Sequence, residues 1–149
     1  MIEKLNFHLR FKTSFGQTIF ITGNHPLLGN GKIEEAVPMV YLNDDYWILH
    51  LETKGLLKEG SLNYSYFIQN ADGTRIFDWG SDKSIIVDQL ATKELVLIDA
   101  WNFTGYIDNT IYSIKEDRNN NLWFGSKIGV QSFDGKKFKD YKIKDSITK

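Results

Sequence analysis

Residues 7–12 read Phe7-His8-Leu9-Arg10-Phe11-Lys12, an alternation of apolar and polar side chains. Successive side chains of a β-strand point to opposite faces, so this stretch would present one apolar row and one polar row. The pattern therefore predicts a β-strand with one buried and one solvent-facing side.

The same pattern recurs along the first two thirds of the chain. Further strands are predicted at 18–22, 46–52, 62–69, 75–79, 84–87 and 94–99. Turns rich in Gly, Asn and Asp separate them, at 14–16, 29–31, 43–45, 58–60 and 70–73. Short strands at regular spacing, without a strong amphipathic helix, are typical of an antiparallel β-sandwich. We therefore predict an all-β protein in which residues 1–101 form such a sandwich.

A second pattern begins after an expected linker at residues 102–109. Strands are predicted at 110–116, 122–126, 129–133 and 137–142, with tight turns at 119–121 and 134–135. Residues 110–149 thus form a four-stranded meander, which is too small to bury both of its faces alone.

Composition excludes several classes of function. The net charge of -1 and the pI near 6.3 provide no field that would attract nucleic acid. No stretch approaches the roughly 20 apolar residues of a membrane span, and the N-terminus lacks the apolar run of a signal peptide. We expect a cytoplasmic protein if this N-terminus is native, and an extracytoplasmic one if a leader was removed.

Candidates for catalysis and metal binding are weak. The chain has no cysteine, which excludes disulfides, thiolate nucleophiles and cysteine-zinc sites. His8, His25 and His50 lack the spacing of metal ligands. The acidic pairs at 34–35 and 44–45 are adjacent in sequence, unlike the opposed carboxylates of a glycosidase. We therefore expect no active site, metal or cofactor.

Six landmarks occur in order over the first hundred or so residues. They are Gly16-Gln17-Thr18-Ile19-Phe20-Ile21-Thr22-Gly23 with Leu28-Gly29-Asn30 and Ala36-Val37-Pro38-Met39; Trp47; Tyr64-Ser65-Tyr66-Phe67-Ile68; Asp72-Gly73; Asp78-Trp79; and Ile98-Asp99-Ala100-Trp101. In this order they resemble a starch-binding module of carbohydrate-binding module family 20. The resemblance implies an immunoglobulin-like sandwich without catalytic activity, bearing up to two sites for α-glucans.

The first implied site depends on Trp79, which matches one of the family's two stacking tryptophans. The second tryptophan falls at Gly31, the family lysine at Ser65 and the family asparagine in the turn at 81–84. Polar contacts to sugar hydroxyls are then expected from four further residues: Asn30, Lys32, Asp82 and Lys83. The alternative for Trp79 is a packing role at the end of a strand.

The second implied site lies at the first turn and the middle strand. Phe15 occupies the place of a family tyrosine, and Gln17 follows it. Tyr41 and Trp47 flank the middle strand. Because Trp47 alternates with Leu49 and Leu51, it is also a core candidate.

The C-terminal segment has a separate resemblance. The stretches at 109–118, 121–125 and 133–138 are similar to one repeat of the propeller of two-component regulators. A single blade leaves its edges and an apolar face uncovered. The chain is then a fragment of a longer sensor, or the blade packs on the sandwich, or blades from several chains form a homo-oligomer.

These observations predict a non-catalytic module that binds starch, glycogen or maltodextrins, with sugar rings stacking on exposed aromatics. Its partner would be an α-glucan polysaccharide or a maltooligosaccharide. The module could belong to a larger amylolytic enzyme or 4-alpha-glucanotransferase. Two alternatives remain: a sensor fragment that recognises a protein or an oligosaccharide, and an interaction scaffold that has lost sugar binding.

Overall fold

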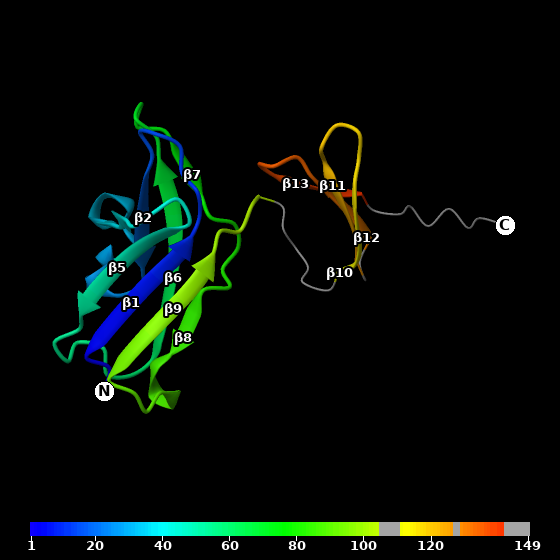
Figure 1. The fold of residues 1–149 in the computed structure, drawn as a ribbon. Helices are drawn as coiled ribbons and strands as arrows, with labels where there is room; N and C mark the ends of the chain where they lie inside the picture. The colour runs from blue at the N-terminus through cyan, green and yellow to red at the C-terminus, as the bar shows by residue number, and fades with distance from the viewer. Residues whose placement is uncertain (105–110, 127–128, 142–149) are drawn as a thin grey trace. The chain divides into compact units, whose positions relative to one another are not determined.

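The computed structural model describes residues 1–104, 111–126 and 129–141 (Figure 1). The chain divides into two compact units, Met1–Trp101 and Asn102–Lys149. The described part of each unit is built from β-strands, and the first unit adds short 3-10 turns, η1 (Pro26–Gly31), η2 (Ile33–Glu35) and η3 (Val87–Gln89). The predicted all-β class is confirmed.

One sheet of the sandwich has the order β4-β5-β1-β9. Its strands are β1 (Lys4–Arg10), β4 (Val40–Tyr41), β5 (Tyr46–Glu52) and β9 (Glu94–Ala100). Strand β1 is antiparallel to β5 but parallel to β9. The first and last strands of the sandwich therefore run side by side in the same direction, which the alternation pattern alone did not predict.

The other sheet has the order β3-β2-β6-β7, and β8 pairs with the first residues of β6. Its strands are β2 (Thr18–Gly23), β3 (Val37–Pro38), β6 (Ser61–Gln69), β7 (Arg75–Phe77) and β8 (Ser84–Ile86). Strand β7 is shorter than the predicted 75–79, so Trp79 lies in the loop that follows it. The two-residue strands β3 and β4 were not predicted from the sequence.

The core lies between the two sheets. Leu5, Phe7 and Leu9 of β1 are fully buried, while Lys4 and Arg10 at its ends are exposed. The Phe7 ring packs edge-on against the ring of Tyr64 from β6, with the ring centroids 5.1 Å apart. The apolar residues that alternate along β1 are therefore the ones that pack against the opposite sheet.

The second unit is an antiparallel meander in chain order. It consists of β10 (Ile111–Glu116), β11 (Leu122–Ser126), β12 (Gly129–Phe133) and β13 (Phe138–Tyr141). Phe103 packs on Phe133 at 4.7 Å between ring centroids, and Thr104 pairs with Lys137. Part of the expected linker therefore contacts this unit, and its residues 105–109 lie outside the described part.

Asp117 organises the turn between β10 and β11. Its carboxylate accepts hydrogen bonds from the backbone N–H of Asn119 at 2.8 Å and of Asn121 at 3.0 Å, and from Trp123 Nε1 at 2.9 Å. These bonds, that of Trp123 first, lower the pKa of Asp117 to about 2. The blade tryptophan thus helps to fix the turn.

Two Phe→Ala variants test this core. Phe7→Ala should lower the free energy of unfolding by about 3–5 kcal/mol, because it removes a fully buried ring. Phe15→Ala makes the same chemical change at a fully exposed position and should stay within about 0.5 kcal/mol of the parent protein. Urea unfolding of the full chain measures both, and equal losses would contradict the assigned burial.

Candidate functional site

A groove of about 690 Å³ lies on the sandwich where β2, the η1 turn, β6 and the loop after β7 meet. Side chains with amide, hydroxyl and ammonium groups line it, together with several glycines. Those used below are Asn30, Gly31, Tyr64, Ser65, Gly80 and Lys83. The groove thus gathers three of the residues expected at the first glucan site: Asn30, Ser65 and Lys83.

The η1 turn is folded by local contacts that bring Asn30 and Gly31 to the groove. His25 caps the turn, since its Nδ1 accepts a hydrogen bond from the N–H of Leu27 at 3.2 Å. The buried Leu28 is held by Thr22, whose hydroxyl donates to the Leu28 carbonyl at 3.3 Å.

Glycine is required at position 29, where φ is +76° and an added Cβ would lie 2.3 Å from the carbonyl oxygen of Glu35. Gly31 has a similar positive φ of +75°, which strains any other residue, but an added Cβ there would meet no atom within 4 Å. This is the position at which the resemblance places the second stacking tryptophan. The groove is therefore open on that side.

Trp79 lies beside this groove in the chain. Gly80 and Ser81, the next two residues, are part of the groove lining, and 42% of the Trp79 surface is exposed. A large aromatic side chain in a loop, left half open to solvent, is available for stacking. Trp79 is therefore not a fully buried core residue, and its stacking role stays a prediction.

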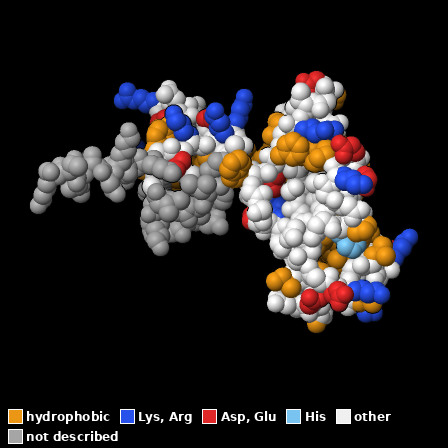
Figure 2. Space-filling view, turned by 180° about the vertical axis from the view of Figure 1, so that it is seen from behind, with side chains coloured by type: hydrophobic (Ala, Val, Ile, Leu, Met, Phe, Trp, Pro, Cys, Tyr) orange, Lys and Arg blue, Asp and Glu red, His pale blue; other side chains and the backbone are white. Residues whose placement is uncertain are grey.

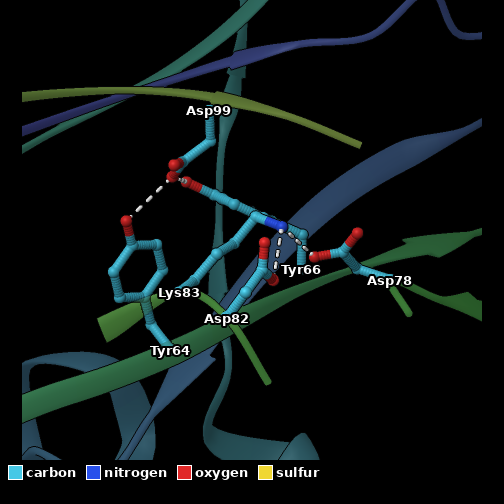
Figure 3. A network of polar contacts seen from close by, with 6 residues as sticks. All are labelled: Tyr64, Tyr66, Asp78, Asp82, Lys83 and Asp99. Carbon is cyan, nitrogen blue, oxygen red and sulfur yellow. Dashed lines mark hydrogen bonds and ion pairs between the residues drawn. The ribbon is translucent and has the colours of Figure 1, made fainter. Parts of the chain in front are cut away.

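Two residues of the groove lining, Tyr64 and Lys83, belong to a polar network (Figure 3). The hydroxyls of Tyr64 and Tyr66 both donate to Asp99 Oδ2, at 2.9 and 2.7 Å, and so join β6 to β9. Burial, reinforced by the negative charge of Asp99, raises the pKa of both tyrosines far above the ordinary value. The network bridges the two sheets with hydroxyls that stay protonated.

Lysines 32 and 83 have different surroundings. Lys83 Nζ lies 2.6 Å from Asp78 Oδ2 and 3.7 Å from Asp82 Oδ1, and its side chain is buried. Lys32 is exposed and pairs with Glu35 at 2.8 Å, which raises the pKa of Lys32. Neither Lys32 nor Asp82 lines the groove, whereas Lys83 does so with its ammonium group already paired.

Two residues expected at the second site, Tyr41 and Trp47, are cross-strand neighbours on β4 and β5. Their ring centroids are 5.6 Å apart, and the Trp47 indole donates to the hydroxyl of Thr13 at 3.2 Å. Trp47 is only 6% exposed, so it mainly supports Tyr41 and the Thr13 segment. Tyr41 is half exposed and donates to Asp44 at 2.8 Å, a bond that lowers the pKa of Asp44.

Phe15 and Gln17 belong to the turn before β2. Phe15 is fully exposed. The Gln17 side chain closes the turn by accepting from the N–H of Ser14 at 2.8 Å and donating to Asn70 at 2.9 Å. The turn therefore presents an aromatic ring on a rigid base, but no described contact joins Phe15 to Tyr41.

A second groove, of about 510 Å³, lies on the outer face of β5, β1 and β9 and was not predicted from the sequence. Asn6 is one of its lining residues: its Nδ2 donates to Glu94 at 2.7 Å, and its Oδ1 lies 2.6 Å from His50 Nδ1. The His8 and His50 rings are 6.0 Å apart, although the two residues are distant in sequence. Among the described residues no three His, Cys, Asp or Glu side chains are grouped to hold a metal.

Figure 2 shows one face of the molecule, on which positive and negative side chains are interspersed over the sandwich without a large area of one sign. This agrees with the small net charge of -1. In the described part of the chain, no helix is long and apolar enough to cross a membrane.

A β-sandwich with a groove of amide and hydroxyl groups beside a half-exposed tryptophan is the arrangement expected of a carbohydrate-binding module. Comparison with known families agrees: residues 3–96, more than half of the chain, match the starch binding domain family, CBM20. The chain belongs to this family of non-catalytic modules, which confirms both the resemblance and the prediction of a module without an active site. Residues 105–127 match a two-component regulator propeller repeat, as expected.

Solved structures show the same fold within much larger enzymes. A glucoamylase from Hypocrea jecorina is 26% identical over 67% of this chain, with a TM-score of 0.56, and the match covers 17% of the glucoamylase. A glucoamylase from Hormoconis resinae is 21% identical over 71% of this chain, with a TM-score of 0.57, and is covered over 18% of its length. A search of curated proteins finds no match.

The raised pKa of Tyr66 predicts the behaviour of the protein in alkali. Above pH 10.0, the ordinary tyrosine value, Tyr66 ionises in the unfolded chain but stays protonated in the folded one, so stability falls as the pH rises. This residue should contribute about 1.4 kcal/mol per pH unit to the fall.

Urea unfolding at a series of pH values from about 9 to about 11 measures this slope. The Tyr66→Phe variant should have the shallower slope, because it lacks the hydroxyl that ionises only in the unfolded chain. Identical slopes in the two proteins would contradict the protonated, buried hydroxyl.

Proposed function

We propose that the sandwich binds α-glucans such as starch, glycogen and maltodextrins at the groove beside Trp79, and that the Trp79 indole is its stacking platform. The observation that carries the proposal is the position of a half-exposed tryptophan next in the chain to two groove-lining residues, in a member of the starch-binding family.

Stacking suits this ligand because a glucose ring has an apolar face of C–H groups. Such a face packs on a flat aromatic ring, and polar side chains nearby bond the hydroxyls at the ring edge. In the groove these groups are the Asn30 amide and the Ser65 hydroxyl. No proton transfer is required, so binding needs none of the carboxylate pairs of a glycosidase.

A second, weaker contact is proposed at Phe15. Its ring is fully exposed at the tip of a turn that Gln17 holds closed. An aromatic ring in a rigid turn can stack on a sugar without a large loss of conformational entropy, but phenylalanine has no hydroxyl to donate. Tyr41, with half its surface exposed, is the polar aromatic residue that the resemblance assigns to the same site.

The larger protein context is also a proposal. The glucoamylases that this chain resembles are several times longer, and the match covers 17% of one of them. By analogy, this module would tether a catalytic or regulatory partner to its glucan. The propeller repeat at 105–127 favours a second candidate, a sensor in which the sandwich recognises an oligosaccharide signal.

Calorimetric titration with maltoheptaose and β-cyclodextrin tests the platform. Trp79→Ala should weaken binding about tenfold or more, because the loss of an aromatic stacking partner typically costs about 1–3 kcal/mol. Trp79→Phe keeps an aromatic ring, so its affinity should lie between those of the parent protein and Trp79→Ala. Phe15→Ala should have a smaller effect, and only on ligands long enough to reach both contacts.

Two outcomes of these titrations would contradict the proposed site. If the parent protein binds neither ligand, the proposal fails, and the alternative of an interaction scaffold that has lost sugar binding is favoured. If Phe15→Ala abolishes binding while Trp79→Ala leaves it unchanged, the glucan site lies at the first turn instead of the groove.

A further inference from the structure

The loop that carries Trp79 is fastened to β6 at both ends. At its start, the Asp78 N–H donates to the Tyr66 carbonyl at 3.0 Å, and at its end the Tyr64 N–H donates to the Lys83 carbonyl at 3.1 Å. Strand β7 ends at Phe77 and β8 begins at Ser84. Residues 79–82 therefore span two fixed points on one strand.

The side chains at these two points form an ion pair. Lys83 Nζ lies 2.6 Å from Asp78 Oδ2, and the two side chains are only 6% and 2% exposed. Figure 3 shows the ammonium group of Lys83 beside the carboxylates of Asp78 and Asp82. The ammonium also lies 5.8 Å from the centroid of the Tyr66 ring, whose hydroxyl is bonded to Asp99.

Stability alone is a weak reason for such a pair. Removing two charges from water offsets most of their attraction, and replacement of both by apolar side chains is often neutral or stabilising. What a buried pair does impose is geometry, because a lone buried charge is costly and each group must stay in contact with its partner. Here that geometry closes the base of the loop.

The loop so closed is the one that meets the groove. Gly80, Ser81 and Lys83 are groove-lining residues, and Trp79 follows Asp78 directly. The Lys83 ammonium, already paired with two carboxylates, is poorly placed to serve as a primary donor to sugar hydroxyls. Its contact with the groove is better explained by the position that it gives to its neighbours.

We propose that Asp78 and Lys83 are positioning residues, whose buried ion pair closes the 79–82 loop and holds the Trp79 indole in its stacking orientation. The inference rests on the proposed glucan-binding function. Neither residue stacks on the sugar; both act through Trp79.

A double variant separates positioning from simple stability. Asp78→Leu combined with Lys83→Met replaces the pair by apolar side chains of similar size, so the full-length protein should keep its urea unfolding midpoint. Maltoheptaose binding should nevertheless weaken about fivefold or more, which is less than the loss in Trp79→Ala. Lys93→Met, which breaks the exposed pair of Lys93 with Glu3 at 3.1 Å, is the matched control and should bind as the parent does.

The indole N–H resonance of Trp79, in protein labelled with ¹⁵N-tryptophan, provides a readout without glucan. It should shift or broaden in the double variant, while the Trp123 resonance in the other unit stays unchanged. Lys83→Met alone leaves the buried Asp78 carboxylate without its ammonium partner, and should lower the unfolding midpoint as well as the affinity.

The outcomes distinguish failure of the positioning role from failure of the proposed glucan-binding function. Parental binding and an unshifted Trp79 resonance in the double variant would overturn the positioning role and leave the proposed function intact, provided that Trp79→Ala loses binding. Absence of glucan binding by the parent protein would overturn both.

Discussion

Contact between the central strands of the two sheets, β1 and β6, is the constraint on which the rest of the sandwich depends. Phe7 of β1 packs against Tyr64 of β6, and Tyr66 beside it is fully buried. A buried tyrosine hydroxyl requires a partner, which Asp99 of β9 supplies at 2.7 Å. Strand β6 is thereby held to the opposite sheet by ring packing and by hydrogen bonds, both made by side chains of one face. The same contacts hold in place the groove-lining residues of β6 and the 79–82 loop, whose ends are hydrogen-bonded to this strand.

Much of this fold could be predicted from the sequence because its causes are local. The alternation of β1 and the turn residues between strands set the element order, and the blade strands were predicted to within a residue or two of their observed bounds. The parallel pairing of β1 with β9 could not be predicted, because side-chain period carries no information on strand direction. The strands β3 and β4, of two residues each, are too short to show a period.

Some residues of the candidate site could likewise be predicted from the sequence, and others could not. Trp79 and Asn30 could be singled out by resemblance, since motifs mark them in the sequence. The pairing of Lys83 with Asp78 could not, because burial and partner choice arise only after β6, β7 and β8 have assembled. The closeness of His8 and His50 could not be predicted either, because it results from the pairing register of β1 and β5. Sequence patterns locate chemical groups, whereas the tertiary fold decides which of them remain available.

The central claim is that α-glucan occupies the groove beside Trp79. The most direct measurement is a maltoheptaose titration of the ¹⁵N-labelled full chain, followed by the backbone amide shifts. The account predicts that the largest shifts gather at the groove residues Asn30, Gly31, Ser65, Gly80 and Ser81. Shifts confined to the groove around Asn6 and His50, or no shifts at saturating sugar, would contradict it.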